Sequence, residues 1–182
     1  MKRAAALGSL WLAVAVAVAA CGPSNIVLTV DVLSFLRSDS LDAFSFGVRG
    51  GVSQTDFTVS RPFTLPSRFG PGKVDSVAVT AGAILEGTQG GGTVALDVFF
   101  AKDEATLFTG QPYVSAHATV SGVQTDTLLP PTTRSVNDTV FSTPTVWVGV
   151  RARLATDPGP DFLGRLAVTV LQLRVVMHDR GF

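Results

Sequence analysis

Hydrophobic residues alternate with polar or small residues over residues 77–85, 94–100, 114–120 and 146–154. A two-residue period places successive side chains on opposite faces of an extended strand. Each of these stretches therefore predicts a β-strand with one face buried and the other face outward.

The outward positions of three of these strands carry most of the chemically distinctive side chains. Alternation then assigns each of these side chains to a face, but not to a neighbour on another strand. They are Thr93, Ala95, Asp97 and Phe99 on the first, Ser115 and His117 on the second, and Trp147, Gly149, Arg151 and Arg153 on the third.

Two further hydrophobic stretches change phase part-way along. The apolar positions move to the other parity between Val170 and Leu171, and again near the start between Val32 and Leu33. A phase change within one strand predicts either a β-bulge or a strand that passes from one sheet to the other.

Turn-forming residues separate the strands. Glycine, proline and aspartate gather in residues 87–92 and 156–161, residues 129–132 contain a Pro-Pro break, and residues 61–73 predict a long loop. Residues 38–42 are compatible with one helical turn.

The composition also favours β-structure. Glutamate occurs only at Glu86 and Glu104, whereas valine, threonine and phenylalanine, which suit pleated strands, are frequent. We expect an all-β fold, an antiparallel β-sandwich of about eight to ten strands, Ig-like or jelly-roll in layout, over a single domain of residues 26–182. Residues 77–98 and 146–170 align as two similar hairpins, which suits either an internal repeat or the general likeness of half-buried hairpins.

The first 21 residues have the pattern of an export signal. Lys2 and Arg3 precede an alanine- and valine-rich run, and small residues Ala19 and Ala20 precede Cys21, the only cysteine. The sequence Val-Ala-Ala-Cys at 18–21 resembles the lipobox of bacterial lipoproteins. An ordinary secretory signal cut after Ala20 and a retained membrane helix are the alternatives, but the run is short for a span.

The resemblance implies a signal peptide over residues 1–20, a diacylglycerol on the Cys21 thiol and a further acyl chain on the new amino end. Residues 21–25 would then be the lipidated cysteine and a tether that reaches at most ~15 Å. Gly22, in place of an aspartate, implies the outer membrane in a diderm cell envelope. The implied partner of the chain is thus a membrane, bound through acyl chains.

Charge and cysteine content exclude some partners. Without Lys2 and Arg3 the chain has 12 basic against 14 acidic residues, a net charge of −2 with no basic stripe, so we expect no nucleic-acid partner. With Cys21 lipidated no disulfide is possible.

No catalytic motif is present, and we expect no enzyme activity, no metal and no cofactor. His117 and His178 are isolated histidines, each expected at the surface or in a hydrogen bond. Asp31 and Asp97 lie inside strands, where a carboxylate pair would suit a hydrolase, with Glu86 as a further acid. The simpler interpretation is that each aspartate faces solvent or pairs with an arginine.

Acidic residues also occur in the turns. Asp103 with Glu104, and Asp157 with Asp161, are oxygen ligands of the kind that Ca²⁺ uses, but neither pair completes a calcium loop. Capping of backbone N–H groups is the ordinary role of such residues, and we expect it here.

Trp147, Arg151 and Arg153 form a candidate ligand-binding patch, and the long loop expected at residues 61–73 is a second candidate surface. A tryptophan beside arginines suits stacking on a sugar ring, whereas a single large aromatic more often covers a core edge. Two functions follow. One is a non-enzymatic structural or protein-interaction module, with envelope proteins as partners. The alternative is a ligand- or glycan-binding lipoprotein that uses the Trp147 and Arg151 face, and burial of Trp147 would weigh against it.

Overall fold

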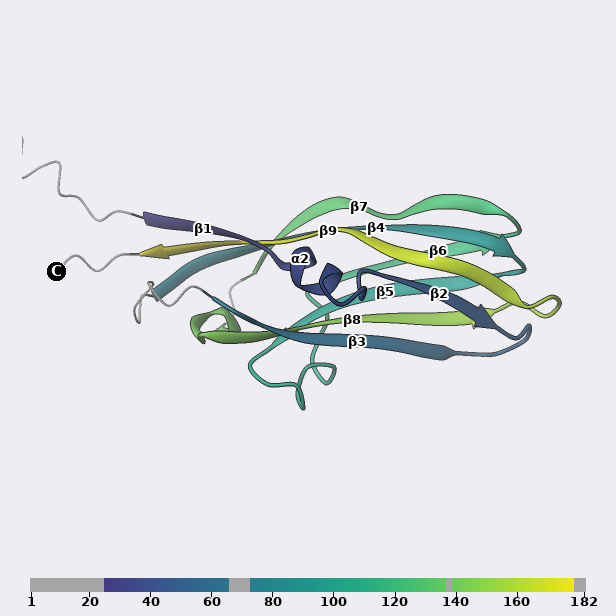
Figure 1. Cartoon of the computed structure of the whole chain (residues 1–182), viewed down its shortest axis with the longest axis horizontal. Coiled ribbons are helices and arrows are strands. Elements are labelled where there is room, and N and C mark those ends of the chain that lie inside the picture. Colours follow the sequence, from purple (N-terminus) through teal and green to yellow (C-terminus); the bar gives the residue numbers. More distant parts are fainter. Residues whose placement is uncertain (1–24, 66–72, 137–138, 179–182) are drawn as a thin grey trace, which may run out of the picture.

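The chain forms two antiparallel β-sheets that pack face to face (Figure 1). The computed structural model describes residues 25–65, 73–136 and 139–178. Within these ranges lie nine strands, one short α-helix and one 3-10 turn. They are β1 (Asn25–Asp31), α2 (Val32–Arg37), β2 (Ala43–Val48), β3 (Thr55–Thr64), β4 (Lys73–Gln89), β5 (Gly91–Ala101), β6 (Val114–Ser121), β7 (Gln124–Val136), η1 (Thr139–Ser142), β8 (Thr145–Thr156) and β9 (Phe162–His178).

The strand pairing is nested. Sheet A has the order β1-β9-β4-β7, with β2 also paired to β9, and sheet B has the order β3-β8-β5-β6. β2 thus pairs with β9, β3 with β8, β4 with β7 and β5 with β6, as in a long hairpin rolled into two layers. This arrangement is the jelly-roll form of the β-sandwich, so the predicted fold class is confirmed.

The predicted inward faces form the core. The inward-facing side chains of β4, β5, β8 and β9 are buried between the sheets, among them Val79, Leu96, Val150 and Leu173. Since the structure buries these residues in one contiguous hydrophobic cluster, the packing of the two sheets follows directly from the two-residue period.

The two phase changes have different causes. On β9, Val170 lies opposite Gly82 and Val168 lies opposite Ala83, so Thr169 is the extra residue of a β-bulge and β9 stays in sheet A. The change after Val32 is instead the start of α2, which breaks the edge of sheet A between β1 and β2. A helical period therefore replaces the strand period there, and the prediction of a bulge or sheet crossing was wrong at this point.

The glycine-rich turns join the two sheets and do not close hairpins. β4 passes into β5 at Gly90, whose φ of +72° suits glycine, and β4 lies in sheet A while β5 lies in sheet B. β8 passes into β9 in the same way. The two expected hairpins were wrong: β4 pairs with β9 and β5 pairs with β8.

Three local expectations also change. Pro130 and Pro131 do not break the chain, because β7 is an edge strand, where a missing N–H is tolerated. The loop expected at 61–73 is shorter, because β3 continues to Thr64 and β4 begins at Lys73; residues 66–72 lie outside the described part. The helical turn expected at 38–42 follows α2, which ends at Arg37.

The helices of the described part give no membrane span, since none is long and apolar enough to cross a bilayer. The expected signal peptide, Cys21 and the tether up to residue 24 lie outside the described residues.

Candidate functional site

The outward face of sheet B carries a set of polar residues that the strand register places side by side. Asp97 on β5 lies between Arg151 on β8 and Ser115 on β6. The next row along the strands places Ala95 between Arg153 and His117. These rows arise from register alone, because opposite residues of paired strands share a face.

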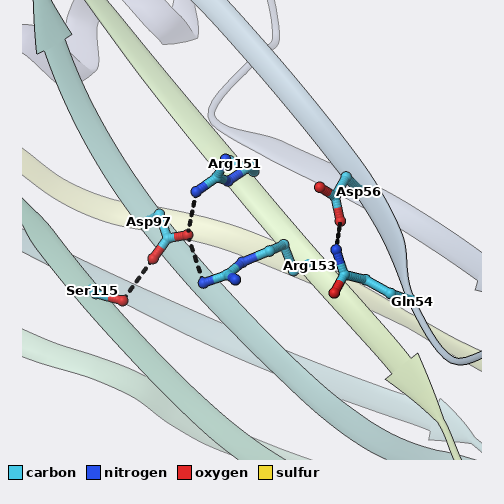
Figure 2. Close-up of polar contacts among 6 residues, drawn as sticks. All are labelled: Gln54, Asp56, Asp97, Ser115, Arg151 and Arg153. Atoms are coloured by element: carbon cyan, nitrogen blue, oxygen red, sulfur yellow. Dashed lines mark hydrogen bonds and ion pairs between the residues drawn. The ribbon is translucent and has the colours of Figure 1, made fainter. Parts of the chain in front are cut away.

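We call Asp97, Ser115, Arg151 and Arg153 the polar cluster (Figure 2). One carboxylate oxygen of Asp97 accepts a hydrogen bond from the Ser115 hydroxyl at 2.6 Å. Its other oxygen lies 3.1 Å from Nη2 of Arg151 and 2.9 Å from Nη2 of Arg153. Asp97 has no exposed surface, whereas the Arg151 and Arg153 side chains are 22% and 40% exposed. The arginines therefore cover the carboxylate and replace its water.

The polar cluster contributes little to the stability of the fold and includes contacts that lower it. Arg151 lies with its guanidinium carbon 4.7 Å from the centre of the Phe99 ring, a cation–π contact. The Nε atoms of Arg151 and Arg153 are buried and have no hydrogen-bond partner within the described part of the chain. An unsatisfied buried donor lowers the free energy of unfolding by about 1–3 kcal/mol. A protein with apolar residues in place of a buried ion pair is often at least as stable.

An open groove adjoins the polar cluster on the same face. Its volume is about 400 Å³, and we call it the sheet-B groove. Ala95 and Thr93 on β5 form its floor, while Arg153 on β8 and His117 on β6 stand one strand away on either side. Since neighbouring strands are ~4.8 Å apart, the two sides are ~10 Å apart. The complete lining is Gln54, Thr93, Ala95, Ser115, His117, Arg153, Leu154 and Ala155.

Trp147 is half-buried in a second, smaller hydrophobic cluster. It packs with Phe108 against Phe99, Ala101 and Leu107. This arrangement is the one expected if Trp147 covers an edge of the core and does not stack on a ligand. Because the indole contributes to this packing, the groove beside Arg153 is the stronger candidate for a ligand site.

The loop of residues 102–113 supplies part of this second cluster. Asp103 accepts hydrogen bonds from the backbone N–H and the hydroxyl of Thr106, at 2.9 and 2.7 Å. Glu104 accepts one from Ser60 on β3 at 2.9 Å. The expected capping role thus holds for Asp103, while Glu104 ties the loop to sheet B.

The structure does not bring the candidate carboxylates together. Asp97 lies in sheet B, whereas Asp31 and Glu86 lie in sheet A, where Glu86 is 3.6 Å from Arg165. Asp97 instead pairs with arginines, as the simpler interpretation predicts.

Among the turn acids, Asp161 accepts a hydrogen bond from the Gly50 N–H at 3.3 Å. The described residues include no group of three or more His, Cys, Asp or Glu placed to hold a metal ion. His117 is exposed, while the His178 side chain lies outside the described part, as does Cys21.

Sequence reasoning missed four residues that the structure adds to this face. Ser115 and His117 were assigned to the outward side of their strand, but nothing linked them to Asp97 or Arg153. Gln54 and Asp56, joined by a 3.0 Å hydrogen bond, lie beside Arg153 (Figure 2). Alternation was the available signal, and the missing information was the register between strands.

No protein-family model matches the chain, and no curated protein sequence matches it. Among solved structures, infectious bursal disease virus (Gx strain) is similar at 10% identity and a TM-score of 0.43, over 88% of this chain and 37% of the viral chain. TmCBM61, solved in complex with β-1,4-galactotriose, is similar at 14% identity and a TM-score of 0.32, over 82% of this chain and 87% of that one.

A third similar structure is dimeric latent PorU from Porphyromonas gingivalis, at 10% identity and a TM-score of 0.32. The similarity extends over 75% of this chain and 13% of the PorU chain. The chain thus spans about a third of the viral protein's length and much less of PorU. With TM-scores below 0.5, these similarities assign no function to it.

Proposed function

We propose that this chain is a lipoprotein of the cell envelope, anchored by acyl chains on Cys21, and that its sandwich is a non-enzymatic binding module. The recognition surface is the outward face of sheet B. The observation that carries this proposal is the polar cluster, with a fully buried carboxylate, beside an open groove on that face.

Energetics supports a binding role for this face. The outward side of a sheet does not need a buried ion pair for stability, and an apolar patch of similar volume is often at least as stable. The polar cluster also leaves two guanidinium Nε atoms without partners in the described structure. Buried polar atoms without a partner are rare in folded proteins and call for an explanation, for which we propose binding at this face.

The position of the groove agrees with this role. β1 begins at Asn25, four residues after Cys21, and Asn25 and Lys73 both pair with His178 at one end of sheet A. The opposite end holds the turn from β4 to β5 (Figure 1). Thr93, on the groove floor, is the third residue of β5 after this turn. The 17 residues of β4 separate these ends by ~55 Å. The groove thus lies far from the anchored end. In that position, envelope components outside the lipid layer can reach it.

Site-specific crosslinking in intact envelopes tests this proposal. A photoreactive amino acid replaces His117 on the outward face of sheet B, and in a matched control it replaces Ala78 on the outward face of sheet A. We expect a defined crosslinked product from position 117 and none from position 78. In a Cys21→Ala background the protein should leave the membrane fraction and the product should disappear.

Two results would contradict the proposal. Equal products from positions 117 and 78 would show that the sheet B face has no special role. A mass of the amino-terminal peptide that shows no acyl group on Cys21 of the unmodified protein would rule out the lipid anchor.

A further inference from the structure

We infer that the sheet-B groove is a binding site for a short, uncharged saccharide, which lies along β5 over Thr93 and Ala95, between Arg153 and His117. This inference rests on the proposed binding function and names the chemical class of its ligand.

The shape of the groove fits a ligand that lies flat on a sheet. Ala95 is the smallest residue of its row, and the longer side chains of Arg153 and His117 flank it on the adjacent strands. Asp97 and the arginines that cover it close the trough along β5, next to Ala95. The ~10 Å between the two flanking strands leaves room for one chain of sugar rings.

The lining groups match hydroxyl-rich ligands. Gln54, Thr93, Ser115, His117 and Arg153 provide amide, hydroxyl, imidazole and guanidinium groups, which together donate and accept hydrogen bonds. A sugar hydroxyl also donates and accepts. An acyl chain or an apolar side chain needs a hydrophobic pocket, whereas the apolar residues of this lining are Ala95, Ala155 and Leu154, and the side chain of Leu154 is buried in the core.

The charges on this face favour an uncharged ligand. Arg151 and Arg153 carry two positive charges, and Asp97 and Asp56 carry two negative charges on the same two rows of the sheet. Because these charges balance, the groove lacks the excess positive charge that would select a carboxylate or a phosphate.

The two longest polar side chains that line the groove, those of Arg153 and Gln54, are held in place before any ligand binds. Asp97 fixes Arg153 at 2.9 Å, and Asp56 accepts a hydrogen bond from the Gln54 amide at 3.0 Å (Figure 2). A side chain that is ordered by a neighbour loses less entropy when it binds a ligand. The polar cluster therefore acts as support for the groove, and its energetic cost has a functional reason.

Binding to printed oligosaccharides tests this inference. The full-length protein, purified in detergent micelles, is applied to an array of neutral hexose and N-acetylhexosamine oligomers together with uronate-containing and phosphorylated ones. We expect binding to at least one neutral oligomer. Ala95→Leu should fill the trough and weaken that binding by at least about tenfold. Ala78→Leu, the matched change on the outward face of sheet A, should leave it unchanged.

A second variant provides an independent test in case Ala95→Leu does not fold. Thr93 is exposed on the groove floor, so Thr93→Gln narrows the trough with little effect on the core, and it should weaken binding in the same direction. Thermal unfolding identifies any variant that has lost its fold, and the conclusion is then drawn from the other one.

Three outcomes would overturn the inference. They are no binding to any neutral oligomer, a preference for the charged oligomers, and equal affinity of the folded Ala95→Leu, Thr93→Gln and unmodified proteins. A protein captured from position 117 in the envelope experiment, with no saccharide bound on the array, would leave the proposed binding function standing and reject the saccharide.

Discussion

Replacement of Asp97 by asparagine is the most direct test of the polar cluster. The change keeps the shape of the side chain and removes its charge. In the variant, an uncharged amide faces the guanidinium groups of Arg151 and Arg153, which lie 3.1 and 2.9 Å from the present carboxylate oxygen. Two like charges then remain side by side without a counter-charge between them.

The magnitude follows from exposure. A hydrogen bond to a charged group contributes about 1.5–3 kcal/mol, and removal of one partner of a buried ion pair costs about 3–5 kcal/mol. The Arg153 side chain is 40% exposed and turns toward water more easily than Arg151 at 22%. We therefore expect Asp97→Asn to lower the free energy of unfolding by about 3 kcal/mol, the lower end of that range. For a chain of this size the loss corresponds to a Tm about 6–12 °C lower.

The assay is urea unfolding of the full-length protein in micelles, followed by far-ultraviolet circular dichroism. The free energies of two proteins are compared when their fitted m values agree. The matched control is the triple change Asp97→Leu, Arg151→Met, Arg153→Met, which replaces all three charged side chains by apolar ones. It should stay within about 1 kcal/mol of the unmodified protein, or exceed it in stability. A loss below about 1 kcal/mol for Asp97→Asn, or an equal loss for the triple variant, would refute the reasoning.

Two further changes test packing. Phe141 is buried against the rings of Phe100 and Tyr113, so Phe141→Ala should lower the free energy of unfolding by about 3–5 kcal/mol in the same urea assay, and an effect under about 1 kcal/mol would contradict this packing. A Cβ at Gly149 would lie 2.8 Å from side-chain atoms of the 102–113 loop, so Gly149→Val should displace the loop and accelerate trypsin cleavage after Lys102. Gly110→Ala, in open space within that loop, should leave the rate unchanged; equal rates for all three proteins would show that Gly149 does not hold the loop.

Local pattern was sufficient for most of the fold. The two-residue period identified the long strands and their buried faces, because burial of one face is a property of each strand alone. It also located the irregularity at Val170. The same signal was ambiguous at Val32, where the structure has a helix, since a few residues of apolar sequence fit either period. The hairpins expected from glycine-rich turns were wrong, because a turn joins two strands equally well within one sheet or between two.

The sequence by itself determined the β-sandwich class and the outward position of Asp97, Arg151, Arg153 and His117. It also carries the lipobox pattern that predicts an anchor at Cys21. Only the tertiary structure decided which outward residues meet. Asp97 is 54 residues from Arg151 and 18 from Ser115, and their contact depends on the register of three strands. Register is set by the packing of the whole core, so no local stretch of sequence contains it.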